Sequence, residues 1–143
     1  MKKWIIILLA LVILGIIGAG LAYKYIYNKP HKNYEIEIVD FSMSANDLFQ
    51  QYRIHTIFAQ QKYNGKVIKI TGILSKIETS GDLTIGVFAL DEGPFGDEGI
   101  RCTMLENHAE DLADYEGKNI TIKGYCTGFN DTDVILEKCS IIK

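Results

Sequence analysis

The chain has 143 residues, of which 48% are hydrophobic and 23% are charged, and it contains 15 Lys and Arg residues against 18 Asp and Glu residues. All 18 acidic residues lie after residue 32, with only ten of the basic ones, so residues 33–143 have a formal charge of −8. This length and charge disfavour a large multidomain enzyme and a protein that gains its affinity by neutralising phosphates. They favour one small domain that follows one apolar segment.

The apolar segment at the amino terminus is long enough to cross a bilayer. From Trp4 to Tyr23 there are 20 consecutive residues without a charge, and a helix of that length measures about 30 Å. The apolar region of a cleaved signal peptide is shorter, about 7 to 15 residues. We therefore predict a retained transmembrane signal-anchor over residues 1–27, with cleavage after Ala22 as the alternative.

Aromatic residues flank this segment at both ends, as they do in helices that cross a membrane. Trp4 lies at one end and three tyrosines lie at the other, as in interfacial aromatic belts: Tyr23, Tyr25 and Tyr27. The first cysteine is Cys102, so no cysteine follows the segment to accept a lipid. The short basic amino terminus favours an orientation that places the domain outside the cytoplasm. Residues 28–43 are expected to form a spacer and lead-in, and residues 44–143 the domain.

The domain is predicted to begin with a helix. Ser44 stands three residues before Asp47 in a capping pattern, and apolar residues follow it. The helix should end at Asn64 and Gly65, since glycine tolerates the backbone conformation that terminates helices. A break near residues 53–55 is compatible with the pattern.

Beyond this helix the hydrophobic period changes to two, which is typical of strands. We predict five strands, at residues 66–78, 82–90, 100–105, 119–127 and 134–142. Gly72 would allow the first strand to bend sharply. The acidic, glycine-rich residues 91–99 are expected to form a loop, and residues 107–115 a short helix between the third and fourth strands. The last two strands should form a hairpin.

This order of elements predicts a mainly β fold, a five-stranded OB-fold Greek-key barrel. One helix precedes the barrel, and another lies between strands three and four. An antiparallel α+β sandwich would give a similar pattern and is the alternative.

Four segments resemble a known family. They are YNGKVIKITG at residues 63–72, IRCTM at 100–104, GKNITIKGYCTG at 117–128 and DVILEKCSI at 133–141. Together they resemble the tRNA-anti-like family of membrane-tethered bacterial OB-fold proteins. The resemblance implies the fold and a place in the cell envelope, but it assigns no residue a role in binding tRNA.

OB-folds bind ligands across strands two and three and the loops that border them. The candidate binding residues are three aromatic residues and the one cation on those two strands: Phe95, Tyr125, Phe129 and Arg101. Phe129 could instead pack within the hairpin loop. The bordering loops contain carboxylates, whereas a groove for single-stranded nucleic acid needs aromatic residues interleaved with Lys and Arg. A carbohydrate, peptide or protein ligand is therefore favoured over nucleic acid.

Cys126 and Cys139 lie on the two strands of the predicted hairpin. If the loop centre falls between Thr132 and Asp133, the two cysteines are directly opposite and can form a disulfide. Two buried thiols are the alternative, and Cys102 is expected to be a core thiol. No C-x-x-C spacing is present, so we predict no metal site at these cysteines.

Catalytic and cofactor motifs are missing from the sequence. It contains no G-x-S-x-G, H-E-x-x-H or phosphate loop, and the acidic segment 91–99 lacks the D-x-D-x-D-G pattern of a calcium loop. His31, His55 and His108 are expected at the surface. We predict a non-catalytic binding or interaction module, anchored in the envelope membrane and without cofactor or metal. A single-stranded nucleic-acid or tRNA-binding OB-fold protein is the alternative.

Overall fold

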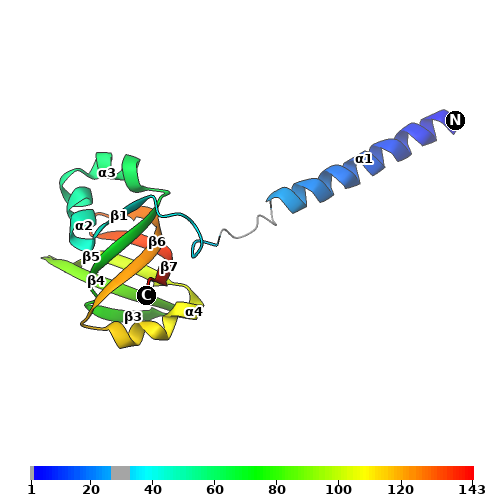
Figure 1. Ribbon diagram of the computed structural model, residues 1–143. Coiled ribbons are helices and arrows are strands. Elements are labelled where there is room, and N and C mark those ends of the chain that lie inside the picture. Colours follow the sequence, from blue (N-terminus) through cyan, green and yellow to red (C-terminus); the bar gives the residue numbers. More distant parts are fainter. Residues whose placement is uncertain (1, 27–32) are drawn as a thin grey trace. The chain divides into compact units, whose positions relative to one another are not determined.

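The computed structural model describes residues 2–26 and 33–143 (Figure 1). Contacts within the chain divide it into two units, Met1–Lys32 and Asn33–Lys143. The predicted spacer, with Pro30 and His31, lies mostly outside the described residues.

The first unit contains one helix, α1, at Lys2–Ile26, with 25 residues. None of its side chains is buried, and its length and composition are sufficient to cross a membrane. Signal sequences share these two properties. The apolar helix predicted over residues 1–27 is therefore present over the part of that range that the structure describes.

The second unit is built on one seven-stranded sheet with the order β1-β2-β6-β7-β5-β4-β3. Its strands are β1 Phe41–Ser44, β2 Val67–Ile73, β3 Lys76–Ser80, β4 Leu83–Gly93, β5 Gly96–Met104, β6 Asn119–Phe129 and β7 Asp133–Ile141. The pairs β1·β2 and β5·β7 are parallel and the other pairs are antiparallel. The helices are α2 Ala45–Ile54, α3 Thr56–Tyr63, α4 Glu106–Ala109 and the 3₁₀ helix η1 Asp111–Tyr115.

The sheet curls so that its two ends meet at Leu74 and Ser75. These two residues join β2 to β3, although β2 and β3 lie near opposite ends of the strand order. The N–H of Leu74 donates to the carbonyl of Lys118, just before β6, at 3.0 Å, and the N–H of Ser75 donates to the carbonyl of Val87 on β4 at 2.9 Å. Because two residues span only about 7 Å, a flat sheet could not make this connection.

The predicted mainly β class is confirmed, but the described residues form seven strands and not five. The strand predicted at residues 66–78 is divided into β2 and β3, and the lead-in adds β1. The bend lies next to Gly72, where a Cβ atom would stand 2.9 Å from Cβ of Ala45 and 3.3 Å from the ring of Phe88. Glycine at this position therefore allows α2 to lie against the bent strand.

The prediction of a loop at residues 91–99 is wrong. β4 continues to Gly93 and β5 begins at Gly96, so this segment is a hairpin arm, here defined as residues 91–98 (Figure 1). Asp91 pairs with Glu98 and Glu92 pairs with Asp97. Strand pairing uses backbone groups, so acidic side chains that reach solvent do not prevent it.

The helical predictions agree with the structure in most details. The Oγ atom of Ser44 accepts a hydrogen bond from the N–H of Asp47 at 3.0 Å, which caps α2. The helix breaks at His55, within the segment named as a possible break, and α3 ends at Tyr63, just before Asn64 and Gly65. The short helix predicted at residues 107–115 is present as α4 and η1.

The lead-in at residues 33–40 packs on the second unit. The ammonium group of Lys123, which is only 6% exposed, donates to the backbone carbonyls of Glu35 and Glu37, the latter at 3.1 Å. The carboxylate of Glu35 also contacts the ring of His108 on α4. This segment is thus attached to the domain from Asn33 onward, which agrees with the division of the chain into two units.

Tyr52 attaches α2 to the sheet. Its ring is fully buried, and its hydroxyl donates to Oδ1 of Asn64 at 2.6 Å and lies 3.1 Å from Sγ of Cys126 on β6. The ring centroid of Phe129 is 5.6 Å away. Burial, together with the contact to Cys126, raises the pKa of Tyr52, so the hydroxyl stays protonated.

The predicted register of the β6–β7 hairpin is wrong. Cys126 is opposite Leu136, not Cys139, and all three cysteines are free and buried. The side chain of Asn130 accepts hydrogen bonds from the N–H groups of Thr132 and Asp133, which moves the turn centre about one residue earlier than predicted. A register shift between Gly128 and Cys126 displaces the next pairs by one more residue, and a second shift between Tyr125 and Lys123 reverses it.

Phenylalanine at position 52 should destabilise the domain. The change Tyr52→Phe keeps the ring but removes a hydroxyl that contacts Asn64 and Cys126, and the loss of buried hydrogen bonds costs about 1–3 kcal/mol. We expect a lower free energy of unfolding in urea denaturation of the full chain. Tyr63→Phe is the matched control, because the described structure shows no hydrogen bond to the Tyr63 hydroxyl, and its equal destabilisation would contradict the role of the Tyr52 hydroxyl.

The three cysteines should be protected as thiols. All are fully buried, and burial raises the pKa of Cys126 and of Cys139, which slows alkylation. We expect almost no labelling of the native protein and three labelled cysteines after denaturation without reductant. A linked Cys126–Cys139 peptide in the protein isolated from its own compartment would show that the register in the structure is not the one formed there.

Candidate functional site

The candidate site is the outer surface of β3, β4 and β5. Side chains alternate along β5, so Ile100, Cys102 and Met104 point into the core, as the sequence predicted, and Arg101 points outward. Register places Arg101 opposite Val87 on β4, and Val87 opposite Lys76 on β3. The two cations therefore lie in one row across three strands, with Val87 between them.

Five charged side chains on this surface form a continuous ion-pair chain, in the order Asp97, Lys76, Glu78, Arg101 and Asp133. The Lys76 ammonium is 3.0 Å from Oδ2 of Asp97 and 3.2 Å from Oε1 of Glu78. Nε of Arg101 is 2.9 Å from Oδ2 of Asp133, and its guanidinium also contacts Glu78. Both cations of the row are thus paired with carboxylates of the same surface.

Asp133 is the most buried member of the ion-pair chain, with its side chain 9% exposed. Its Oδ1 accepts a hydrogen bond from the N–H of Gly99 at 3.0 Å. Gly99 cannot carry a side chain, because a Cβ atom there would lie 1.8 Å from the carbonyl oxygen of Phe88. Asp133 therefore joins the start of β7 to the backbone of β5 and holds the guanidinium of Arg101 in position.

The ion pairs favour the charged form of each group. Burial opposes the charge on Arg101, but the bonds to Asp133 and Glu78 outweigh it and raise the Arg101 pKa. Burial likewise acts to raise the Glu78 pKa, yet Lys76 and Arg101 lower it overall. The bonds to Asp97 and Glu78 raise the Lys76 pKa. These side chains are consequently charged at neutral pH, and carboxylates of the same surface balance the positive charges of Lys76 and Arg101.

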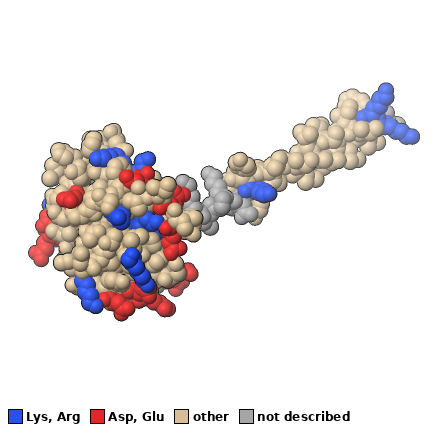
Figure 2. All heavy atoms as spheres, in the orientation of Figure 1, with Lys and Arg blue, Asp and Glu red and all other residues tan. Residues whose placement is uncertain are grey.

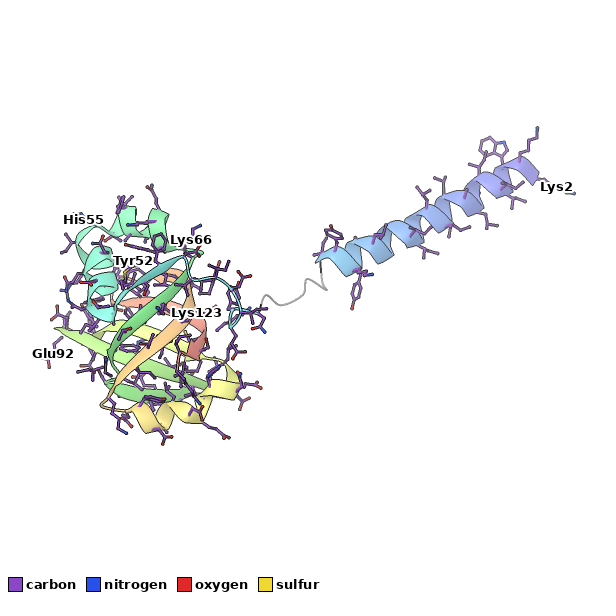
Figure 3. All side chains as sticks on the ribbon, in the orientation of Figure 1. Lys2, Tyr52, His55, Lys66, Glu92 and Lys123 are labelled. Carbon is purple, nitrogen blue, oxygen red and sulfur yellow. The ribbon has the colours of Figure 1, made fainter. Side chains whose placement is uncertain are left out.

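An open, acidic depression adjoins the ion-pair chain through Asp97. Its volume is about 430 Å³, and it is lined by Ala89, Leu90, Asp91, Glu92 and Asp97. Figure 3 labels Glu92 on the arm. Carboxylates accept hydrogen bonds from hydroxyl and amino groups, so this surface suits a ligand rich in such donors. Within residues 2–26 and 33–143 no three His, Cys, Asp or Glu side chains are placed to hold a metal ion.

The four predicted binding residues have different surroundings. Arg101 lies in the ion-pair chain, and Phe95 is 97% exposed at the tip of the arm. The ring centroid of Tyr125 is 5.0 Å from that of Tyr34. Phe129 lies on β6 and packs against Tyr52 of α2, so it does not face the candidate site, and it does not pack within the hairpin loop as its alternative interpretation proposed.

Sequence reasoning missed Lys76 and Asp97 as members of this surface. The two residues are 21 positions apart, and only the pairing of β3, β4 and β5 brings their side chains together. The alternation of Lys76 and Glu78 within one predicted strand was the available signal that both point to the same side.

Two of the three histidines are within the described residues. His55 forms the junction between α2 and α3, and His108 contacts the lead-in at Glu35. His31 lies outside the described residues. Neither described histidine is part of the candidate site.

Comparison with known proteins gives a family match and a match to a solved structure. The model of the tRNA_anti-like family matches residues 1–141. The solved structure, described as a putative nucleic acid-binding lipoprotein from Klebsiella pneumoniae subsp. pneumoniae MGH 78578, is 20% identical, with a TM-score of 0.58. The match covers 80% of this chain and 100% of that chain, and at this identity it shows a shared fold alone. The curated proteins include no match.

Glu78 should titrate at a lower pH than an ordinary glutamate. Its pKa is below the usual value of 4.5 in the folded state, so its ion pairs stabilise the fold above pH 4.5, and this contribution is lost as the pH falls through the lowered pKa. Carboxyl NMR titration measures the pKa directly, and Glu78→Gln should weaken the acid dependence of unfolding. A titration midpoint at or above 4.5 would contradict the ion-pair arrangement.

Proposed function

Because this chain belongs to the tRNA_anti-like family, we propose that it is a membrane-anchored, non-catalytic OB-fold binding module of the cell envelope. This is the family that the four sequence segments predicted. The non-catalytic part of the proposal rests on the catalytic motifs that the sequence lacks.

The strand order supports the OB-fold part of the proposal. If β2 and β3 are the two halves of one bent strand, the order β3-β4-β5-β7-β6-β2 is that of a five-stranded barrel closed by its first strand. The helical segment α4–η1 then lies between the third and fourth barrel strands. In this interpretation β1, α2 and α3 are additions before the barrel.

The apolar helix supports the anchoring part of the proposal. The 25 residues of α1 bury no side chain, and such an apolar surface is stable in a bilayer and not in water. The Klebsiella protein is itself described as a lipoprotein, which agrees with a place in the envelope. We propose a single-pass topology with the domain outside the cytoplasm.

The pairing of Lys76 and Arg101 with carboxylates is the observation that disfavours nucleic acid as the ligand. Nucleic-acid binding requires cations that can replace counterions along the phosphates, but Lys76 and Arg101 are already paired with Glu78, Asp97 and Asp133. The carboxylates that line the acidic depression can still accept hydrogen bonds from hydroxyl and amino groups of a ligand. We therefore propose a carbohydrate, peptide or protein ligand.

Single-stranded nucleic acid is the second candidate ligand. The description of the Klebsiella protein as nucleic acid-binding favours it, and so does the range of ligands that OB-folds bind. The charge of residues 33–143 and the paired cations of the surface disfavour it.

Binding measurements on the full chain in detergent can separate the ligand classes. We expect a lysine-rich peptide or an oligosaccharide to bind more tightly than a single-stranded RNA or DNA 12-mer, whose dissociation constant should be no lower than about 10⁻⁴ M at physiological salt. The double variant E78Q/D97N should weaken the favoured binding about tenfold or more. E106Q/E110Q, with the same charge change on exposed residues of the α4 segment, is the control.

Two results would contradict this proposal. Micromolar oligonucleotide binding with a steep salt dependence would establish the second candidate. Equal losses in E78Q/D97N and E106Q/E110Q would show that net charge, and not the candidate surface, determines binding.

A further inference from the structure

The junction between α2 and α3 exposes three large apolar side chains. Ile54, Ile57 and Phe58 are 67%, 74% and 56% exposed, and they are here called the apolar corner. With His55 and Thr56 they line a shallow depression of about 420 Å³. The two helices already bury other residues against the sheet, including Leu48, Phe49, Tyr52, Ala59 and Tyr63. The three side chains of the apolar corner are thus not part of the packing that holds the two helices on the sheet.

The charge around the apolar corner differs from that of the rest of the domain. Residues 48–77 contain no Asp or Glu and five of the ten basic residues of the domain: Arg53, Lys62, Lys66, Lys69 and Lys76. In the view of Figure 2, blue Lys or Arg atoms lie among tan atoms at the α3 end, with some red atoms near them, and the largest group of red atoms lies at the opposite end. Arg53 and Lys76 are paired with carboxylates of the arm and of β3, so Lys62 and Lys66 provide the positive charge near the apolar corner on a domain with a formal charge of −8.

Two lysines of this region are placed to act with the apolar corner. The ammonium of Lys62 lies 5.6 Å from the centroid of the Phe58 ring and 5.1 Å from that of Tyr63. Lys66 is exposed beyond the end of α3, and Figure 3 shows it at the same end of the domain as His55. Arg53 instead contacts Asp91 and Glu98 of the arm. Lys62 and Lys66 are therefore the cations of this surface.

We propose that the apolar corner and these two lysines bind the anionic surface of the bilayer. Ile57 and Phe58 would enter the interfacial layer, and Lys62 and Lys66 would face lipid phosphates. A surface that combines exposed apolar side chains with cations is typical of interfacial membrane binding. This inference rests on the proposed anchoring by α1, because a tether raises the effective concentration of the domain at the membrane to about millimolar.

Charge complementarity favours lipid over the other occupants. A symmetric contact between two copies would place Lys62 and Lys66 near the same lysines of the second copy, and like charges repel. Nucleic acid would match the charge, but two of the three exposed side chains of the corner are isoleucines, which offer no ring for base stacking. An anionic bilayer is both negative and apolar, so it matches both properties of the surface.

A fluorescent label beside the corner can test the contact in the full chain. Gln61 is exposed and lies one turn after Ile57, so Gln61→Cys accepts an environment-sensitive dye such as NBD while the corner stays intact. The native cysteines are fully buried and should remain unlabelled. The protein is placed in nanodiscs of phosphatidylcholine alone or with 30% phosphatidylglycerol.

We expect a blue shift of the dye and at least twofold quenching by spin-labelled lipid in the anionic discs. The variants I57S/F58S and K62E/K66E should each remove most of this quenching. K118E/K143E changes two lysines outside the acid-free residues 48–77 and should leave it unchanged. A dye attached at Leu83→Cys, a position that is 53% exposed on β4, should show neither the blue shift nor the quenching.

Three results would overturn the proposal. If the dye at position 61 stays in water while α1 keeps the chain in the discs and in alkaline-washed membranes, the anchoring stands and the bilayer contact is wrong. If the chain leaves the membrane fraction, the anchoring fails and the contact fails with it. If energy transfer between labelled copies replaces lipid quenching, the corner binds a second copy.

Discussion

The closure of the sheet at Leu74 and Ser75 is the constraint on which the rest of the domain depends. Two adjacent residues bond to the segment before β6 and to β4, which are separated by β7 and β5 in the strand order, and this forces the sheet to enclose a core and to turn its other side outward. That outer side holds the ion-pair chain. The same closure brings the bent strand against α2, where Tyr52 reaches Cys126 on β6, so the α2–α3 extension is positioned by the barrel-like sheet.

The distribution of charge, more than its total, determines what each surface can bind. A count of charges describes the domain as acidic, yet the structure separates a surface whose cations are internally paired from the apolar corner, which has Lys62 and Lys66 nearby. The first surface has hydrogen-bond acceptors to offer, and the second has cations and apolar side chains. The proposed ligand and the proposed membrane contact would therefore use different faces of one small domain.

Local signals in the sequence predicted local structure well. The Ser44 cap, the end of the helices before Asn64 and the β character of the second half all follow from short-range preferences. The errors lie where side chains act across the chain. Asn130 shifted the hairpin turn by its own hydrogen bonds, and backbone pairing extended strands into the acidic arm. The link between Lys76 and Asp97 depends on strand register, which no short pattern specifies.

The burial of all three thiols bears on how the domain folds. If the chain folds outside the cytoplasm, its cysteines are exposed to oxidants until the sheet closes over them. Sγ of Cys139 occupies the space where a Cβ of Gly124 would stand, 2.4 Å away, so an incorrectly oxidised Cys139 could not be accommodated in the core. With that topology, folding and thiol oxidation would be competing reactions, and the rate of sheet closure would determine what fraction of the chains reaches the native state.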